Sequence, residues 1–297
     1  MADTSYRGRF VWHELMTTDT KSAAEFFRKV IGWRSQAGGP DGYQMFMAGG
    51  RSAGGMMMLP EEARAAGTPP TWLYYIATPG VDETAAQAVS IGGRILRPAA
   101  DIPNVGRFAV LADPQGAMFA AFTPGPMPAG GGGLTVEDFS WHELATTDWR
   151  GAMSFYRRLF GWEEAGSFDM GPAMGTYLLF GLNGKQMGGM FTKPPQMPGP
   201  SAWLAYMRVP DAKKTAAAIT AAGGKVINGP MEVPGGGWIA QALDRQGVVF
   251  AVHSPKPTVA SAPKKKIMPA KTKVTPAKKK AAAKKKVAVK KKTARRR

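Results

Sequence analysis

The feature that most constrains the fold is a ten-residue stretch that occurs twice in the chain. Residues 10–19 read Phe-Val-Trp-His-Glu-Leu-Met-Thr-Thr-Asp, and residues 139–148 read Phe-Ser-Trp-His-Glu-Leu-Ala-Thr-Thr-Asp. Each copy runs into a helix-like segment that closes on Gly-Trp, at 32–33 and at 161–162. Later matches between the two halves keep the same order along the chain. Such a duplication predicts a fold that is built twice.

Within each half, the apolar pattern predicts a strand, a helix and three short strands, and then the same series again. Residues 9–17 are typical of a strand, and the apolar residues of 20–31 recur at helical spacing before Gly32 ends the helix. The series starts again with a strand at 72–78 and a helix at 82–91. The chain from 9 to 255 therefore contains four strand-helix-three-strand modules.

Composition divides the chain into five segments. A run of glycines at 130–133 is typical of a linker, and from Lys256 onward Lys, Ala and Pro dominate. The predicted segments are an N-terminal extension at 1–8, a first domain at 9–124, a Gly/Pro linker at 125–135, a second domain at 136–255, and a disordered basic tail at 256–297.

The net charge of +18 comes from the tail. The chain has 39 basic and 21 acidic residues, and 18 of the basic residues follow position 255 without a single acid. The rest of the chain is therefore neutral, with 39 − 18 = 21 basic against 21 acidic residues. Cysteine is absent, which excludes disulfides, thiolate metal sites and cysteine nucleophiles.

The tail predicts a separate function. Its Lys triplets, spaced by Ala and Val, resemble histone-H1-like basic tails, which would bind DNA or RNA by neutralising phosphates without reading sequence. The alternative is a solvated tail that only adds solubility. The predicted nucleic-acid-binding residues are Lys264, Lys265, Lys266, Lys278, Lys279, Lys280, Lys284, Lys285, Lys286, Lys290, Lys291, Lys292, Arg295, Arg296 and Arg297.

The repeated motifs resemble the vicinal oxygen chelate superfamily, which includes glyoxalase I, bleomycin-resistance proteins and extradiol dioxygenases. The resemblance rests on the Trp-to-Asp stretches at 12–19 and 141–148, the aromatic pairs that follow them, the two Gly-Trp endings, and the Asp-Pro-Gln-Gly turn at 113–116. More narrowly, the chain is similar to tandem-domain glyoxalase-like proteins often labelled hydroxylases. The match covers residues 9–255.

The resemblance implies an α+β fold of two tandem glyoxalase-like domains. In this superfamily, paired βαβββ modules form an open eight-stranded barrel around one pocket, so one pocket per half is expected here. Metal-dependent members carry His, Gln or Glu ligands on the first and last strands of each module. Counted from the helix-start Asp, these positions fall on Trp12 and Trp141, and on Ala120 and Ala251. We therefore predict no metal and no cofactor in either half.

His13 and His142 occupy equivalent positions in the two copies. A shift of one residue in the register would make each a metal ligand and restore metal-dependent lyase or dioxygenase chemistry. Strand alternation instead places Trp12 and Glu14 toward the pocket and His13 toward the helix, which favours a structural histidine. The third histidine, His253, is expected to pack near the end of the last strand.

Glu14 and Glu143 are the predicted catalytic residues. A buried carboxylate on the pocket face can act as a general base or bind a polar group of a ligand. The alternative is a glutamate that forms an ion pair with a basic neighbour at the rim of the strand. Trp12 and Trp141 share that face and would bind a flat ligand or fill the barrel. Tyr75 and Tyr206 complete the predicted ligand-binding residues.

Two functions remain open on the sequence. The first is a small-molecule-binding protein or enzyme with a metal-free, mostly apolar pocket, where proton transfer at a small carbonyl compound is the expected reaction if it is an enzyme. The second is a nucleic-acid-associated protein whose domains bind an effector or only each other. With no signal segment and no apolar run of bilayer length, we expect a cytoplasmic location without membrane contact, at the nucleoid if the tail binds DNA.

Overall fold

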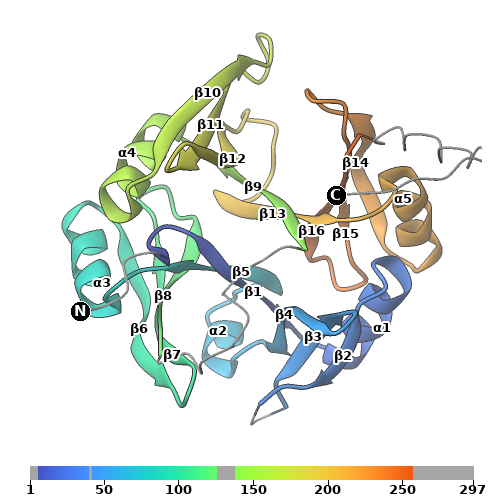
Figure 1. The fold of residues 1–297 in the computed structure, drawn as a ribbon, viewed down its shortest axis with the longest axis horizontal. Helices are drawn as coiled ribbons and strands as arrows, with labels where there is room; N and C mark the ends of the chain where they lie inside the picture. The colour runs from blue at the N-terminus through green and yellow to red at the C-terminus, as the bar shows by residue number, and fades with distance from the viewer. Residues whose placement is uncertain (1–5, 40–41, 126–137, 257–297) are drawn as a thin grey trace, which may run out of the picture. The chain divides into compact units, whose positions relative to one another are not determined.

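Each half of the chain forms one eight-stranded mixed sheet, as the computed structural model shows for residues 6–39, 42–125 and 138–256 (Figure 1). The first half comprises β1 (Phe10–Thr17), α1 (Thr20–Val30), β2 (Arg34–Ala37), β3 (Gln44–Ala48), β4 (Arg51–Met58), α2 (Glu61–Ala65), β5 (Thr71–Ala77), α3 (Val81–Ser90), β6 (Arg94–Ile102), β7 (Gly106–Ala112) and β8 (Met118–Pro124). The second comprises β9 (Phe139–Thr146), α4 (Trp149–Phe160), β10 (Glu163–Asp169), β11 (Thr176–Leu182), β12 (Lys185–Thr192), β13 (Ala202–Arg208), α5 (Ala212–Ala221), β14 (Lys225–Glu232), β15 (Trp238–Leu243) and β16 (Val249–Ser254).

The two sheets have the same topology. The strand orders are β2-β3-β4-β1-β5-β8-β7-β6 and β10-β11-β12-β9-β13-β16-β15-β14. Within a module the first strand pairs in parallel with the fourth, and two modules join through their antiparallel first strands, β1 with β5 and β9 with β13. This confirms the predicted α+β fold of paired βαβββ modules that form an open sheet. The short helix α2 lies between β4 and β5 and is not part of the predicted series of elements.

The major helices begin and end where the sequence predicts. The Asp19 carboxylate caps α1 by accepting a hydrogen bond from the Ser22 backbone, and Asp148 and Asp211 cap α4 and α5 in the same way. The predicted apolar stripe of α1 is buried at Ala23, Phe26, Phe27 and Val30. No helix in the described ranges is long and apolar enough to span a membrane.

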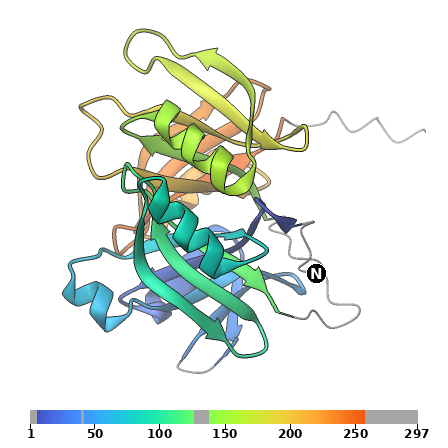
Figure 2. The ribbon, with the colours of Figure 1, turned by 90° about the vertical axis from the view of Figure 1, so that its left-hand side faces the viewer.

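The two halves share one core. A single cluster of buried residues runs from Leu15 and Phe27 in the first half to Leu144 and Phe250 in the second. The helices of one half contact those of the other, α1 with α5 and α3 with α4, and Figure 2 shows α3 and α4 side by side. Both halves therefore belong to one compact unit, and the boundaries of two separate domains stay a prediction. The residues of the tail predicted to bind nucleic acid lie outside the described residues.

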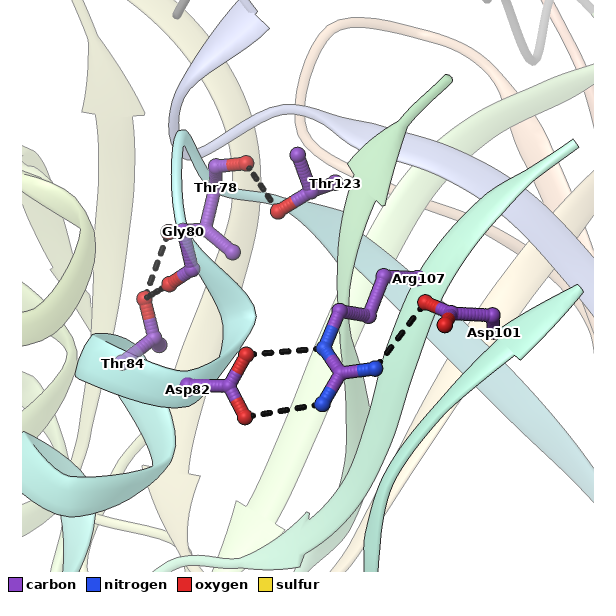
Figure 3. A network of polar contacts seen from close by, with 7 residues as sticks. All are labelled: Thr78, Gly80, Asp82, Thr84, Asp101, Arg107 and Thr123. Carbon is purple, nitrogen blue, oxygen red and sulfur yellow. Dashed lines mark hydrogen bonds and ion pairs between the residues drawn. The ribbon is translucent and has the colours of Figure 1, made fainter.

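Arg107 ties the first turn of α3 to the β6–β7 hairpin (Figure 3). Its guanidinium donates two hydrogen bonds to Asp82, at 2.7 and 3.0 Å, and one to Asp101, at 2.9 Å. Nearby, the Thr123 hydroxyl donates to the Thr78 carbonyl at 2.9 Å. These ion pairs are exposed to solvent, so they contribute little to the stability of the fold.

Candidate functional site

All six residues predicted to act on a small molecule lie in two matching clusters, one on the concave face of each sheet. Glu14 and Tyr75 project from β1 and β5 in the first half, and Glu143 and Tyr206 from β9 and β13 in the second. Trp12 and Trp141 lie beside them on the same strands. The twofold repeat of the sequence thus becomes two carboxylate clusters of the same design.

In the first half, Glu14 is held by two phenols. The Tyr75 hydroxyl donates to Glu14 Oε1 at 3.0 Å, and Tyr43 also hydrogen-bonds to this carboxylate. The Trp12 indole donates to the Tyr43 hydroxyl at 3.0 Å. Arg97 contributes a favourable charge and lies over the Phe108 ring, 5.0 Å from its centre.

In the second half, Glu143 has the same two phenols and one additional amide. Tyr177 donates to Oε2 at 2.9 Å, and Tyr206 donates to Oε1 at 3.0 Å. The Trp141 indole donates to Tyr177 at 2.9 Å. Gln241 Nε2 lies 3.2 Å from Glu143 Oε1 and 2.7 Å from the Tyr206 hydroxyl. Every carboxylate oxygen of Glu143 is therefore an acceptor in this network.

Tyr43, Tyr177, Arg97 and Gln241 were not predicted as site residues. The two tyrosines carried a signal, because Tyr-x-x-Phe occurs at 43–46 and again at 177–180 in equivalent positions of the repeat. Arg97 and Gln241 gave no such signal in the sequence, because the equivalent position of the other half holds a different residue in each case.

Two glycines make room for these tyrosines. A Cβ atom on Gly55 would lie 1.8 Å from the Tyr43 hydroxyl, and one on Gly189 would lie 2.0 to 2.3 Å from atoms of the Tyr177 ring. Both halves share a Gly-Gly-Met motif on β4 or β12. Its second glycine is required because the tyrosine side chain crosses the strand at this point to reach the carboxylate.

Burial sets the protonation of both clusters. Desolvation raises the pKa of Glu14 and of Glu143, and the hydrogen bonds from the phenols oppose this shift in part. Burial, together with the nearby carboxylates, also raises the pKa of all four tyrosines, so these donate hydrogen bonds and stay neutral. Each cluster is therefore a carboxyl group of raised pKa surrounded by neutral donors.

The side chains of these clusters do not fit a divalent metal. Each offers one carboxylate whose oxygens already accept phenolic protons. The same-face neighbours on adjacent strands are Leu73 and Ala120 in the first half and Leu204 and Ala251 in the second, which supply no donor. Among the residues with described positions, no group of three His, Cys, Asp or Glu lies close enough to hold an ion.

His13 and His142 lie on the opposite face, against each other. Their Nε2 atoms are 2.8 Å apart, and each ring stacks on a phenylalanine of the other half, His13 on Phe139 and His142 on Phe10. His13 is buried on the face of the sheet away from Glu14, where strand alternation placed it. Its partner is the other histidine, because the convex faces of β1 and β9 meet in the shared core.

The hydrogen bonds of this pair assign its tautomers. His142 bonds to the backbone of Met187, which makes its Nδ1 the protonated nitrogen and its Nε2 the acceptor. His13 then donates from Nε2, and its Nδ1 is a buried atom without a partner. Burial lowers the pKa of His13 well below its ordinary value and that of His142 to about 3. Each histidine directly precedes its glutamate on the strand, so the imidazole and the carboxyl group project from opposite faces of the sheet.

His253 lies near the end of β16, as expected, where its Nδ1 is 2.9 Å from the Ser140 hydroxyl. Two surface hollows occur at other places, one at the β6–β7 turn and one at the start of α3.

Comparison with known proteins assigns the family. The pattern of the Glyoxalase/Bleomycin resistance protein/Dioxygenase superfamily matches residues 9–121 and again 138–252. The chain belongs to this superfamily and carries two tandem copies of its domain.

Relatives of similar length support the assignment. A Mycobacterium tuberculosis protein named "Putative glyoxylase CFP32" is 33% identical over 253 residues, which cover 83% of this chain and 94% of the relative. The anthracycline biosynthesis protein DnrV of Streptomyces peucetius is 26% identical over 269 residues, covering 82% and 92%.

Solved structures show the same fold at low sequence identity. A 2,2',3-trihydroxybiphenyl 1,2-dioxygenase from Sphingomonas wittichii is similar with a TM-score of 0.60 at 10% identity, over 84% of this chain and 90% of that one. The Mn(II)-bound glyoxalase from Novosphingobium aromaticivorans is similar with a TM-score of 0.56 at 14% identity, over 84% and 82%.

Proposed function

We propose that this protein binds a small molecule on the concave face of its sheets, with Glu14 and Glu143 as the groups that orient it or exchange a proton with it. The observation that carries the proposal is the repeated cluster of one desolvated carboxyl group and two phenols, with the Glu14 side chain buried and the Glu143 side chain partly buried. Burying a carboxyl group costs free energy, and nothing in the folding of the sheet requires it at this position. Its presence in both halves therefore favours a ligand.

The raised pKa suits proton transfer. A carboxylate of raised pKa is a stronger base than an ordinary glutamate, and the surrounding phenols are hydrogen-bond donors. Beside the carbonyl of a bound molecule, the carboxylate would take a proton from carbon. The C–H electron pair would form a carbon–carbon double bond while the π pair of the carbonyl group moves to its oxygen, where a donor such as the Gln241 amide stabilises the negative charge of the enolate. Proton transfer at a small carbonyl compound is thus the reaction that we propose if the protein is an enzyme.

One protein of similar fold, the glyoxalase from Novosphingobium aromaticivorans, is bound to Mn(II). None of the proposed steps requires a metal. Metal-dependent chemistry based on His13 would need this side chain on the concave face, whereas it lies in the shared core.

Thermal-shift screening of small carbonyl and aromatic compounds against the full chain tests the proposal. A hit should lose affinity when both glutamates are changed, in the variant Glu14→Gln/Glu143→Gln. Glutamine keeps the size of the side chain but not the charge or the basicity. Unchanged affinity and unchanged turnover in this variant would remove the carboxyl groups from the proposed function.

A second candidate function, association with DNA or RNA, rests on the charge of the tail. The last 42 residues hold 18 basic and no acidic residues, whereas the rest of the chain is neutral. We expect the full chain to bind duplex DNA with an affinity that falls steeply with salt, and a 1–255 truncation to bind far more weakly. Equal binding by the two proteins, or binding that is insensitive to salt, would exclude this role and the nucleoid location with it.

A further inference from the structure

We infer that the concave face of the second sheet is the ligand site of this protein, that the first concave face is closed by its own side chains, and that the ligand is a flat apolar molecule with a hydrogen-bonding oxygen. This inference rests on the proposed function, which it narrows to one half of the chain and one chemical class.

The central strands differ in exposure at equivalent positions. In the first half the concave face is buried at Glu14, Met16 and Leu73. The equivalent residues of the second half, Glu143, Ala145 and Leu204, are all partly exposed. The exchange of methionine for alanine removes most of a side chain next to the carboxyl group. Solvent therefore reaches the second cluster from a direction that is filled in the first.

The outer strands differ in the same way. Phe108, Val110 and Phe122 of β7 and β8 are buried and form a separate apolar cluster with Tyr75. Their equivalents in the second half are Ile239, Gln241 and His253, which are partly exposed. Two of the three exchanges introduce a hydrogen-bonding group, and one of these groups, Gln241, contacts the carboxylate itself. The second face is thus both more open and more polar near Glu143.

The connection after the fourth strand also differs between the halves. In the first half this connection contains the short helix α2 (Figure 1). Leu59 is buried in the apolar cluster, and Ala63 of α2 packs against that cluster. Lys193 stands at the position equivalent to Leu59, since the two backbones bond to Thr146 and Thr17 in the same way. The segment from 193 to 201 contains no helix.

Three large apolar side chains on the same face of the second sheet as Glu143 are exposed. Phe168 lies opposite Tyr177 in the β10–β11 register, so both project from the concave face, and it is 43% exposed. On the other side, Met231 and Val249 share that face and are 44% and 43% exposed. Exposed apolar side chains on a concave face that also carries a carboxyl group favour the binding of a ligand there.

The chemistry of this face defines the ligand class. Trp141, Tyr177 and Phe168 supply aromatic surface, which favours a flat apolar ring system. At the base, Glu143 and Gln241 supply a carboxyl group and an amide, which bind a hydroxyl or carbonyl oxygen. A molecule with aromatic rings and one such oxygen, like a naphthol, satisfies both.

Accessibility is tested with single cysteines, because the chain has no cysteine of its own. Leu73→Cys and Leu204→Cys place a thiol at equivalent positions of the two faces. We expect 5,5'-dithiobis(2-nitrobenzoate) to label Leu204→Cys at least about ten times faster than Leu73→Cys in the folded protein. Equal rates, or faster labelling in the first half, would overturn the asymmetry.

The ligand class is tested with 1-naphthol, and naphthalene serves as the control that lacks the oxygen. We expect 1-naphthol to bind the full chain with one site, to slow labelling of Leu204→Cys, and to bind more tightly than naphthalene. Ala145→Met, which fills the second face as the first is filled, should weaken binding about tenfold. Met16→Leu is the matched control in the first half and should leave binding unchanged.

The outcomes separate this inference from the proposed function. Two naphthol sites per chain, no naphthol binding, or equal binding of naphthalene would overturn the inference. If a screening hit nevertheless binds and depends on both glutamates, the proposed function survives that failure. If no hit depends on either glutamate, the proposed function fails as well.

Discussion

Phe27 and Tyr156 occupy equivalent positions in the two halves and differ by one hydroxyl group. The Tyr156 hydroxyl accepts a hydrogen bond from Trp203 at 2.9 Å and donates one to Asp113 at 3.1 Å, which joins the two halves. At the equivalent place, Phe27 packs against the ring of Trp72 and offers no polar atom. Trp72 Nε1 and Asp244 Oδ2 are accordingly two buried atoms without a partner.

Phe27→Tyr should therefore stabilise the protein. The new hydroxyl would pair with both orphaned atoms, and we expect the free energy of unfolding to rise by about 1–2 kcal/mol. The reciprocal change, Tyr156→Phe, should lower it by about 2–3 kcal/mol because it orphans two buried groups. Urea denaturation of the two variants measures both effects. A destabilising Phe27→Tyr would mean that the space beside Trp72 cannot hold a hydroxyl.

The histidine pair should make the stability of the protein depend on pH. Burial lowers the pKa of both imidazoles, so the folded protein keeps them neutral where the unfolded chain takes up protons. Their contribution is fully present above pH 6.5 and is lost as the pH falls toward the folded-state pKa, about 3 for His142. The expected loss is about 1.4 kcal/mol per pH unit for each histidine that stays neutral.

Denaturation midpoints between pH 7 and pH 5 test this, with His13→Gln/His142→Gln as the variant. The carboxyl groups of raised pKa act in the opposite direction and are unchanged in the variant, so the difference between variant and wild type isolates the pair. The variant should have a flatter profile. His253→Gln, a change at the half-buried third histidine, should retain most of the wild-type slope.

At the scale of elements, the turn between β15 and β16 is hydrogen-bonded to the turn between β1 and α1 of the other half through the side chain of Gln246. Gln246 Oε1 accepts hydrogen bonds from the Thr17 hydroxyl at 2.7 Å and from the Thr18 backbone and hydroxyl at 3.1 and 2.7 Å. Its Nε2 donates to the Asp19 carbonyl at 3.0 Å. One side chain thus holds the start of the duplicated helix against the other half.

Gln246→Ala should lower the free energy of unfolding by about 2 kcal/mol, since it leaves a partly buried turn without these partners. Gln115 is the matched control. It occupies the equivalent turn, but its Oε1 has no partner, so Gln115→Ala should cost less. The order of the two denaturation midpoints checks the prediction, and an equal or larger cost for Gln115→Ala would contradict it.

At the scale of the molecule, the shared core predicts that one half does not fold alone. Phe10, His13 and Leu15 of the first half are buried in a cluster that continues into Phe139 and Leu144 of the second. A chain of residues 1–125 would expose this surface. We expect it to be insoluble or to lack a cooperative unfolding transition, whereas coexpression with 138–255 should restore one. A cooperative transition of the isolated half as a monomer would show that the halves are independent domains.

The sequence by itself determined the modules, the order of their elements and the face from which Trp12 and Glu14 project. Helical spacing, glycine stops and the two-residue period of a strand are local properties, so they can be read along the chain. The duplication then placed the same residues at equivalent points of the second half. The superfamily followed from the same motifs.

Only the tertiary structure decided what those residues contact. Tyr43 directly precedes β3 and reaches Glu14 on β1 across Gly55 of β4. His13 finds its partner 129 residues away because two convex faces pack together. The difference between the two concave faces likewise depends on which side chains fill the curve of each sheet. Such packing is a non-local property. The Trp-His-Glu-Leu stretch is identical in both halves, whereas the side chains that pack around it differ.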